Sequence, residues 1–382
     1  MSSIPFISKK VGNNYLVWFQ NSNHYVQLEE PAWFVFKKIT KRYKTSTIAF
    51  DFASRYGFSH EESLVFVNDI GAEIKKLNQK NHSPNNSNSL PEKANEHYFT
   101  PFIVRHYKLG NQVIAFSFAS LLFEYWIHPL ISHFETTEVQ KDMPLFELFE
   151  YQEHVAFRYN GKIRGLWTMD ETQYVKGMIF MYLVNVMHDK TDEDWLMTVH
   201  ASAISNGKKT ILFSAEPGKG KTTFAALLQQ RGYQLISDDF VPIDRESFRA
   251  YPFPIAISVK QGSMDLLTPI YPDLVNKKLN KLSADKFVRY LAPPNHVEVL
   301  KWIFPVIELI FIEYNSAVDF NLEKIEPVIG LKMLLDQAWV PPMHANAKDL
   351  LDRLIEISFF KLSYSNNQKA LDAVADLFNK DQ

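Results

Sequence analysis

The residues of this sequence with the clearest chemical potential lie between positions 215 and 239. A run of eight residues, Ala-Glu-Pro-Gly-Lys-Gly-Lys-Thr, starts at Ala215 and ends at Thr222. Glycines let a turn direct its N–H groups at phosphate oxygens, the lysine adds a positive charge, and the threonine can bind Mg²⁺. The run therefore predicts a phosphate-binding loop of the Walker A type. Its nucleotide-contacting residues would be Glu216, Pro217, Gly218, Lys219, Gly220, Lys221, Thr222 and Thr223.

The segments on either side of this loop favour the same interpretation. Residues 210–214 form a short apolar run typical of a buried strand, and apolar residues at helical spacing follow the loop until Gly232. A helix that begins at the loop adds its N-terminal dipole to an anion site. The strict pattern starts with glycine, and Ala215 is small enough to replace it. A turn that binds nothing is the alternative, but it would need neither the lysine nor the threonine.

Two adjacent carboxylates, Asp238 and Asp239, follow the next predicted strand, residues 233–237. In a parallel sheet that strand would end at the same edge as the loop. Adjacent strand residues point to opposite faces, so the two carboxylates would differ in function unless the chain turns there. One could bind Mg²⁺ while the other removes a proton from an acceptor hydroxyl. A solvated Asp-Asp turn is the alternative, which the position one helix after the loop disfavours.

Length and composition indicate a multidomain protein without a general affinity for nucleic acid or membranes. The chain has 382 residues, of which 46% are hydrophobic, a formal net charge of −2 and no cysteine. This length predicts two or three domains, and the charge gives no general attraction to nucleic acid or anionic membranes. The lack of cysteine excludes disulfides and favours the cytoplasm. The longest apolar stretch, residues 178–187, is shorter than the roughly 20 residues that cross a bilayer, so we predict a buried helix there.

A polar, proline-containing segment at residues 78–97 divides the sequence. It holds too few apolar side chains to offset the entropy of ordering, so we predict a linker. The order of elements before it, a hairpin and three short helices, predicts a winged-helix (α+β) domain over residues 1–77. The predicted elements are strands over 14–19 and 24–28 and helices that begin at Pro31, at Thr45 and after a capping box at Ser59.

The rest of the chain predicts an α/β protein in two parts. Residues 98–194 read as a β-rich accessory lobe packed on the core that follows, residues 195–382. In the lobe, we expect strands over 102–107, 113–117, 123–127 and 154–159, with a tight turn at Asn160-Gly161. In the core, Asn206-Gly207 predicts a two-residue hairpin before the loop. Further core elements are strands over 308–314 and 359–364 and helices over 328–335, 349–357 and 368–378.

These motifs resemble the C-terminal kinase domain of HPr kinase/phosphorylase. The sequence is still more similar to HPr-kinase-like proteins of ribosomal-peptide biosynthesis, including kinases of lasso-peptide precursors. The shared features are the loop, the aspartate pair, the strand His200-Ala-Ser-Ala, and Tyr251-Pro-Phe-Pro followed by Lys260 and Gly262-Ser263. The match covers residues 98–380 in pattern and 195–265 in motif. It implies a P-loop kinase core of HPr-kinase-like type in residues 195–382.

The resemblance also implies roles for individual residues. Lys221 and Thr222 would hold the phosphates of ATP and Mg²⁺. Asp238 would be the general base and Asp239 a carboxylate on the metal, although the two could exchange roles. His200 would position the phosphate or the acceptor beside the loop, and a core histidine bound to backbone is the alternative. The implied catalytic residues are Asp238, Asp239, His200 and Lys221, and the implied metal ligands are Thr222 and Asp239.

Two basic residues further along, Lys260 and Arg289, are candidate clamps for phosphate or substrate, although most lone arginines are surface residues. The sequence shows no obvious counterpart of the glycine-rich segment that HPr kinase/phosphorylase uses for the reverse, phosphorolytic reaction. We therefore expect a kinase that works in one direction.

Residues 10–77 resemble the PqqD-like recognition domains of peptide-modifying systems, which hold a leader peptide as an added strand. We therefore predict an ATP- and Mg²⁺-dependent kinase that phosphorylates a Ser or Thr hydroxyl of a precursor peptide whose leader binds residues 10–77. A nucleotide-gated peptide-binding protein without chemistry of its own and a small-molecule kinase are the alternatives. No nucleic-acid or membrane partner is expected, and by analogy with related kinases a homo-oligomer stays open. The sequence does not decide between ATP and GTP.

Overall fold

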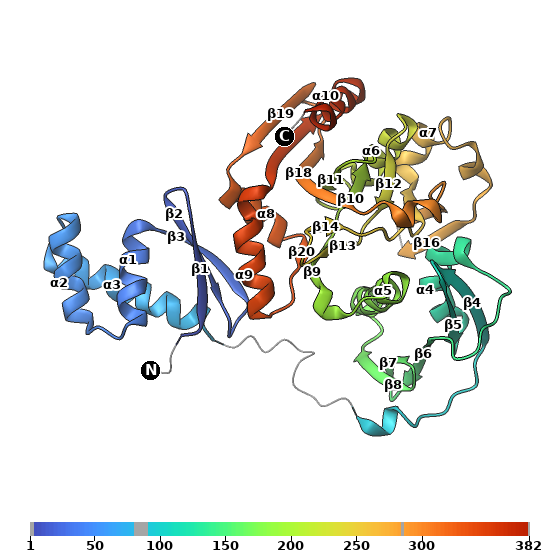
Figure 1. Cartoon of the computed structure of the whole chain (residues 1–382), viewed down its shortest axis with the longest axis horizontal. Coiled ribbons are helices and arrows are strands. Elements are labelled where there is room, and N and C mark those ends of the chain that lie inside the picture. Colours follow the sequence, from blue (N-terminus) through green and yellow to red (C-terminus); the bar gives the residue numbers. More distant parts are fainter. Residues whose placement is uncertain (1–3, 80–90, 284–285, 381–382) are drawn as a thin grey trace. The chain divides into compact units, whose positions relative to one another are not determined.

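The computed structural model describes residues 4–79, 91–283 and 286–380 (Figure 1). The chain divides into two compact units, of which the first comprises residues 1–87 and 325–359 and the second residues 88–324 and 360–382. Residues 325–359 thus group with the N-terminal residues, although the sequence predicts them as part of the core. Most of the predicted linker, residues 80–90, lies outside the described residues.

The first unit begins with an antiparallel sheet of order β1-β2-β3, followed by three helices. Its elements are β1 (Phe6–Val11), β2 (Asn14–Phe19), β3 (His24–Glu29), α1 (Glu30–Thr40), α2 (Thr45–Tyr56) and α3 (His60–Leu77). The predicted hairpin and helices are confirmed, and β1 is a strand that the sequence pattern missed. The predicted capping box starts α3, because the Ser59 hydroxyl accepts from the Glu62 N–H and the Glu62 carboxylate accepts from the Ser59 N–H.

The same unit is completed by residues from much later in the chain. They form α8 (Pro327–Leu335), β20 (Ala338–Trp339) and α9 (His344–Arg353). Helix α9 packs on β1, where the Lys9 ammonium donates a 2.7 Å hydrogen bond to the Asp352 carboxylate. The helix predicted over 349–357 starts five residues earlier and ends earlier, in a 3-10 turn at Leu354–Glu356.

The N-terminal part of the second unit is a lobe built on the sheet β4-β5-β6-β7-β8, with α4 and α5 packed on it (Figure 1). Its elements are β4 (Ile103–Leu109), β5 (Gln112–Phe118), α4 (Leu121–Ile131), β6 (Leu145–Tyr151), β7 (His154–Tyr159), β8 (Lys162–Trp167) and α5 (Thr172–His188). Residues 91–97, at the end of the predicted linker, lie against this lobe. There Arg158 donates hydrogen bonds to the carbonyls of Asn95 and His97.

One predicted strand of the lobe is wrong. Residues 123–127 belong to helix α4, because the Ser120 hydroxyl caps its first turn by accepting from the Phe123 N–H at 3.3 Å. The buried side chains of Phe123, Ile127, Leu130 and Ile131 recur at helical spacing. The predicted buried helix over 178–187 is confirmed as the second half of α5. Of the helices in the described ranges, none has the length and apolar character needed to cross a bilayer.

The core of the second unit is a mixed sheet of order β12-β10-β11-β18-β14-β13-β9, extended by β21 beside β18 and by β19 beside β21. Its strands are β9 (Trp195–Val199), β10 (Ser202–Ser205), β11 (Thr210–Ser214), β12 (Gln234–Ser237), β13 (Val241–Asp244), β14 (Arg249–Ala250), β18 (Phe304–Tyr314), β19 (Phe320–Ile325) and β21 (Ser358–Tyr364). Helices α6 (Lys221–Gln230) and α10 (Asn367–Asn379) pack with the strands around the apolar core. The predicted two-residue hairpin at Asn206-Gly207 is a four-residue loop, because Ser205 pairs with Thr210.

A small antiparallel sheet of order β15-β17-β16 completes the second unit. Its strands are β15 (Ile257–Lys260), β16 (Leu279–Ser283) and β17 (Lys286–Leu291), and the short helix α7 (Met264–Leu267) follows β15. The sequence pattern did not identify these strands. Strand β15 packs against α6, so this sheet lies next to the helix that begins at the phosphate-binding loop.

A glycine pair in the lobe tests how tightly its side chains pack. A Cβ on Gly165 would lie 1.9 Å from the Trp167 ring, whereas a Cβ on Gly177 in α5 would meet nothing within 4 Å. We expect Gly165→Ala to lower the free energy of unfolding by about 1–3 kcal/mol, because the indole must move. Gly177→Ala should be neutral or raise it by about 0.5–1 kcal/mol, because alanine favours a helix. Urea unfolding of both variants is the measurement, and equal stabilities would contradict this packing.

Candidate active site

Strand direction brings three segments of the second unit to one edge of the core sheet. Strand β10 is antiparallel to both β11 and β12, so β11 and β12 run in the same direction on either side of it. The phosphate-binding loop follows β11, Asp238 follows β12, and His200 precedes β10. The sequence predicts this shared edge correctly, although an antiparallel strand separates the two strands.

The backbone of the loop has the conformation that an anion site requires. Gly218 has a φ of 87° and Gly220 a φ of 98°, and α6 begins at the next residue, Lys221. At Gly218 a Cβ would meet nothing within 4 Å, so the glycine is needed for its φ rather than for space. The first N–H groups of α6 therefore face the end of the loop with no helical carbonyl to bind.

Lys221 is buried between the two aspartates. Only 7% of its surface is exposed, and its ammonium lies 3.4 Å from the Oδ1 atom of Asp238 and also donates to the Asp239 carboxylate. Burial alone would lower the pKa of the lysine, but the two carboxylates raise it, so Lys221 is held in its charged form.

Asp238 is buried, with 2% of its surface exposed, and accepts hydrogen bonds on both oxygens. Ser202 and Lys221 donate to Oδ1, and the Thr222 hydroxyl donates to Oδ2 at 3.2 Å. Burial raises the pKa of Asp238, while the charge of Lys221 and the Ser202 hydrogen bond oppose that rise. The carboxylate is thus fixed in position by three side chains from two elements.

Asp239 has a different environment although it is the next residue. Its φ of 65° turns the chain at the end of β12, so both carboxylates reach Lys221 instead of pointing to opposite faces. Its side chain is 44% exposed. Desolvation opposes ionisation, but the positive charge of Lys221, with a further contribution from the nearby His200, outweighs it and lowers the pKa of Asp239.

His200 lies beside this turn. Its Nδ1 atom donates to the Asp239 carbonyl at 3.1 Å, which leaves Nε2 3.9 Å from an Asp239 carboxylate oxygen. His200 is thus bound to backbone, as the alternative interpretation expects. Its side chain is 46% exposed, however, so it is not a core histidine.

The donors at this edge fit Mg²⁺ shared with phosphate. A threonine hydroxyl and two carboxylates are hard oxygen ligands, and Mg²⁺ usually takes one or two carboxylates together with water and phosphate oxygens. Across residues 4–79, 91–283 and 286–380, no cluster of three or more His, Cys, Asp or Glu side chains could form an all-protein cage. Thr222 and at least one of the two aspartates would hold the ion, and only together with a bound nucleotide.

Lys260 lies on the face of the small sheet that is turned toward the aspartates. Ser258 pairs with Tyr290 in the β15–β17 register, and alternation puts Lys260 on the same face as both. The charge of Lys260 lowers the pKa of Asp239. Burial, Tyr125 and the Asp239 charge raise the pKa of Tyr290 to about 12. Tyr290 also lines a cavity of about 560 Å³ bordered by α4, so a recess opens next to this face.

Arg289 lies on the opposite face of the same sheet, and its role as a clamp stays a prediction. It pairs with Val259, and its guanidinium donates to the carbonyl of Leu274 at 2.7 Å and to that of Val275. These carbonyls belong to the 3-10 turn Pro272–Asn276. Arg289 therefore holds that turn.

Two serines of the site were missed by the sequence pattern. Ser202 is fully buried on β10 and donates to Asp238, and Ser263 bonds the Thr223 hydroxyl at 2.8 Å. Both belong to motifs quoted for the family resemblance, so their position in those motifs was the available signal. The remaining loop side chains face outward. Glu216 and Pro217 are exposed, and Lys219 binds Glu313 at 2.8 Å.

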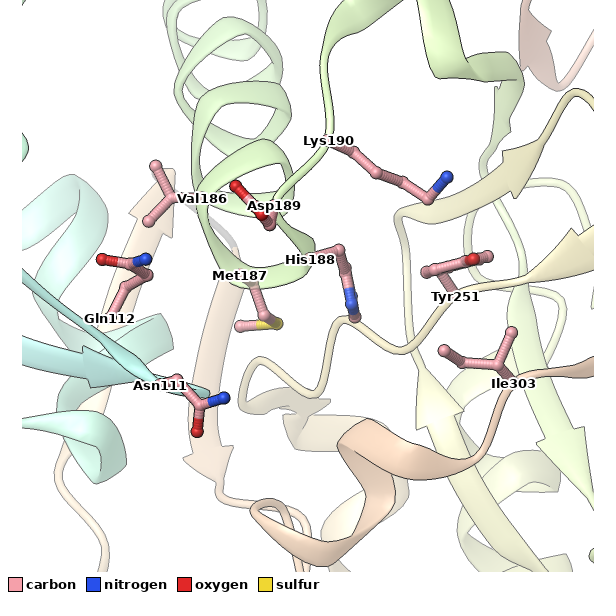
Figure 2. Close-up of a pocket in the computed structure, with 9 residues that line it drawn as sticks. All are labelled: Asn111, Gln112, Val186, Met187, His188, Asp189, Lys190, Tyr251 and Ile303. Carbon is pink, nitrogen blue, oxygen red and sulfur yellow. The ribbon is translucent and has the colours of Figure 1, made fainter.

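The Tyr251-Pro-Phe-Pro segment has a structural role at a second cavity, of about 440 Å³ (Figure 2). His188, the last residue of α5, and Lys190, just after the helix, line it together with Tyr251. The His188 ring bonds the Pro252 carbonyl at 2.6 Å, and Lys190 binds Asp244 at 2.7 Å. Burial lowers the pKa of His188 to about 4, so its ring is neutral. No residue of the phosphate-binding loop lines this cavity.

Comparisons with known proteins do not identify a family for this chain. No protein-family model and no curated protein sequence matches this chain. A search of solved structures finds the HPr(Ser) kinase/phosphatase from Coxiella burnetii, with 13% sequence identity over 47% of this chain and 89% of that chain. Its TM-score of 0.22 is too low to define a shared fold, so a function for this chain must be inferred from the geometry of its own site.

Proposed function

We propose that this chain is an ATP- and Mg²⁺-dependent kinase that transfers a phosphoryl group to a hydroxyl. One observation carries the proposal: Lys221, Thr222 and the aspartate pair converge at the N-terminus of α6, beside a loop with two glycines in the left-handed conformation. Phosphoryl transfer needs positioned phosphates, charge neutralisation and a proton acceptor, and this arrangement offers all three.

The chain's own residues divide these tasks. ATP with Mg²⁺ would supply the phosphoryl group and neutralise its charge. The loop N–H groups and Lys221 would bind phosphate oxygens, and Lys221 would then exchange part of its contact with the carboxylates for the nucleotide. Thr222, which already bonds Asp238, would share the metal with it.

Exposure favours Asp239 as the proton acceptor. Asp238 lies beneath Ser202, Thr222 and Lys221, where an acceptor hydroxyl has no access, whereas the Asp239 side chain is 44% exposed. Geometry comes before pKa in choosing a base. We therefore assign Asp238 to the metal and Asp239 to the acceptor hydroxyl as the general base. This is the reverse of the roles that the family resemblance implies, an exchange that the sequence left open.

Paired substitutions test the proposal and the roles. Calorimetry of the full-length protein should detect Mg²⁺-dependent ATP binding. We expect Asp239→Asn to keep that binding but to lower phosphoryl transfer by about 100- to 10 000-fold, because the base is lost. Asp238→Asn should raise the Mg²⁺ concentration needed for binding. A wild-type protein that binds no nucleotide would end the kinase proposal, and binding without transfer to any acceptor would favour the nucleotide-gated binding protein.

The Ser202 hydrogen bond predicts a pH effect. It lowers the pKa of Asp238, so Ser202→Ala should raise that pKa and protonate the carboxylate at higher pH. Protons compete with Mg²⁺ for Asp238, so the acidic limb of the kcat/KM profile for Mg-ATP should move to higher pH. Ser205→Ala is the matched control, because Ser205 is equally buried at the other end of β10 and bonds Lys209 and Gly207. An equal shift in both variants would refute the role of Ser202.

We further propose that the acceptor is a Ser or Thr of a precursor peptide whose leader binds residues 10–77. The support is the edge of the first sheet. Among the described residues, β3 pairs with β2 alone, and an unpaired strand edge can take a peptide as an added strand.

The leader's contribution can be measured on the substrate side. Peptides encoded beside the gene of this chain should be phosphorylated at one hydroxyl, as seen by mass spectrometry. Removing the leader should raise KM by about 10-fold or more with kcat retained, because the lost contacts lie outside the reacting group. An unchanged KM would favour the small-molecule kinase.

A further inference from the structure

The sheet order gives the two sides of the phosphate-binding loop different neighbours. Strands β10 and β12, with the aspartate pair, lie on one side of β11, and β18 lies on the other. Because β18 is parallel to β11, its last residue, Tyr314, arrives at the same edge as the loop. A nucleotide whose terminal phosphate lies at the aspartates would therefore extend its base toward the side of Tyr314.

Tyr314 is tied to the loop by contacts at adjacent residues. Its N–H donates to the Lys219 carbonyl at 3.0 Å, and the preceding Glu313 carboxylate binds the Lys219 ammonium at 2.8 Å. A Cβ placed on Gly220 would lie 3.4 Å from the Cβ of Tyr314. The distance between this tyrosine and the phosphate-binding N–H groups is thus set by the fold.

The ring of Tyr314 is held and yet open to solvent. It meets the buried ring of Tyr364 edge to face, at a centroid distance of 5.7 Å and an interplanar angle of 86°. The next residue, Asn315, donates its N–H to the Tyr364 carbonyl at 2.8 Å. Even so, 50% of Tyr314 is exposed. A fixed, exposed aromatic ring next to a phosphate site has the properties of a stacking surface for a base.

We propose, on the basis of the nucleotide binding proposed above, that Tyr314 is the platform on which the base of the bound nucleotide stacks. A stacked base gains roughly 5- to 150-fold in affinity, and the gain depends on the aromatic ring rather than on hydrogen bonding. The phosphates gain nothing from this ring, because they bind the loop backbone and Lys221.

A ligand without a base separates the two contributions. Full-length wild type, Tyr314→Ala, Tyr314→Phe and the control Tyr174→Ala are titrated with Mg-ATP and with Mg-tripolyphosphate. Tyr174 is matched in exposure, at 54%, and lies in the first turn of α5. We expect Tyr314→Ala to bind Mg-ATP about 5- to 150-fold more weakly, with Tyr314→Phe and Tyr174→Ala close to wild type. Tripolyphosphate should bind all four proteins equally.

Each other result has its own meaning. If Tyr314→Ala binds Mg-ATP as tightly as wild type, the platform does not exist. If Tyr314→Ala loses affinity for both ligands equally, Tyr314 supports the loop and contacts no base, which also overturns the proposal. If the wild type binds neither ligand, the nucleotide-dependent function itself fails, a result distinct from the other two.

Discussion

The site depends on one buried electrostatic contact, that of Lys221 with the carboxylates of Asp238 and Asp239. A cation with 7% of its surface exposed is stable only beside compensating charge, and the buried carboxylate of Asp238 needs the lysine in return. This mutual requirement fixes the ends of β11 and β12 against each other. It also explains the left-handed φ of Asp239, because without that turn the second carboxylate would face away. A bound polyanion with Mg²⁺ can substitute for both partners of this contact. The phosphates would take the place of the carboxylates beside Lys221, and Mg²⁺ would take the place of Lys221 beside the carboxylates.

Much of the local structure could be predicted because its signals are local. The bounds of α2 and β11 and the capping box of α3 follow from spacing, turn residues and side-chain caps. The error at residues 123–127 has a physical cause, since a short aromatic and apolar run fits a strand or a buried helix, and the Ser120 cap decides between them. The hairpin of β10 and β11 is a local signal, but the pairing of β12 with β10 could not be foreseen, because strand order is set by pairing between distant segments.

In the candidate site too, the features with a local sequence signal were predictable and those set by long-range pairing were not. The loop and the aspartate pair were found because their chemistry requires residue types at fixed spacing. The face on which a side chain lies was not accessible, so Arg289 was grouped with Lys260 although strand alternation separates them. Ser202 was missed as a site residue because a serine in a buried strand gives no spacing signal of its own, and only its place in the His200-Ala-Ser-Ala motif marked it. Its role becomes visible when β12 brings Asp238 beside it.

The return of residues 325–359 to the first unit has a consequence for the order of folding. Strand β1 is made early in synthesis, but its partner helix α9, with Asp352 opposite Lys9, is made more than 300 residues later. A chain emerging from the ribosome must therefore carry an incomplete N-terminal unit while most of the second unit is already available to fold. During this interval the side of β1 that later contacts α9 has no helix to cover it, which is the condition under which incompletely folded chains associate.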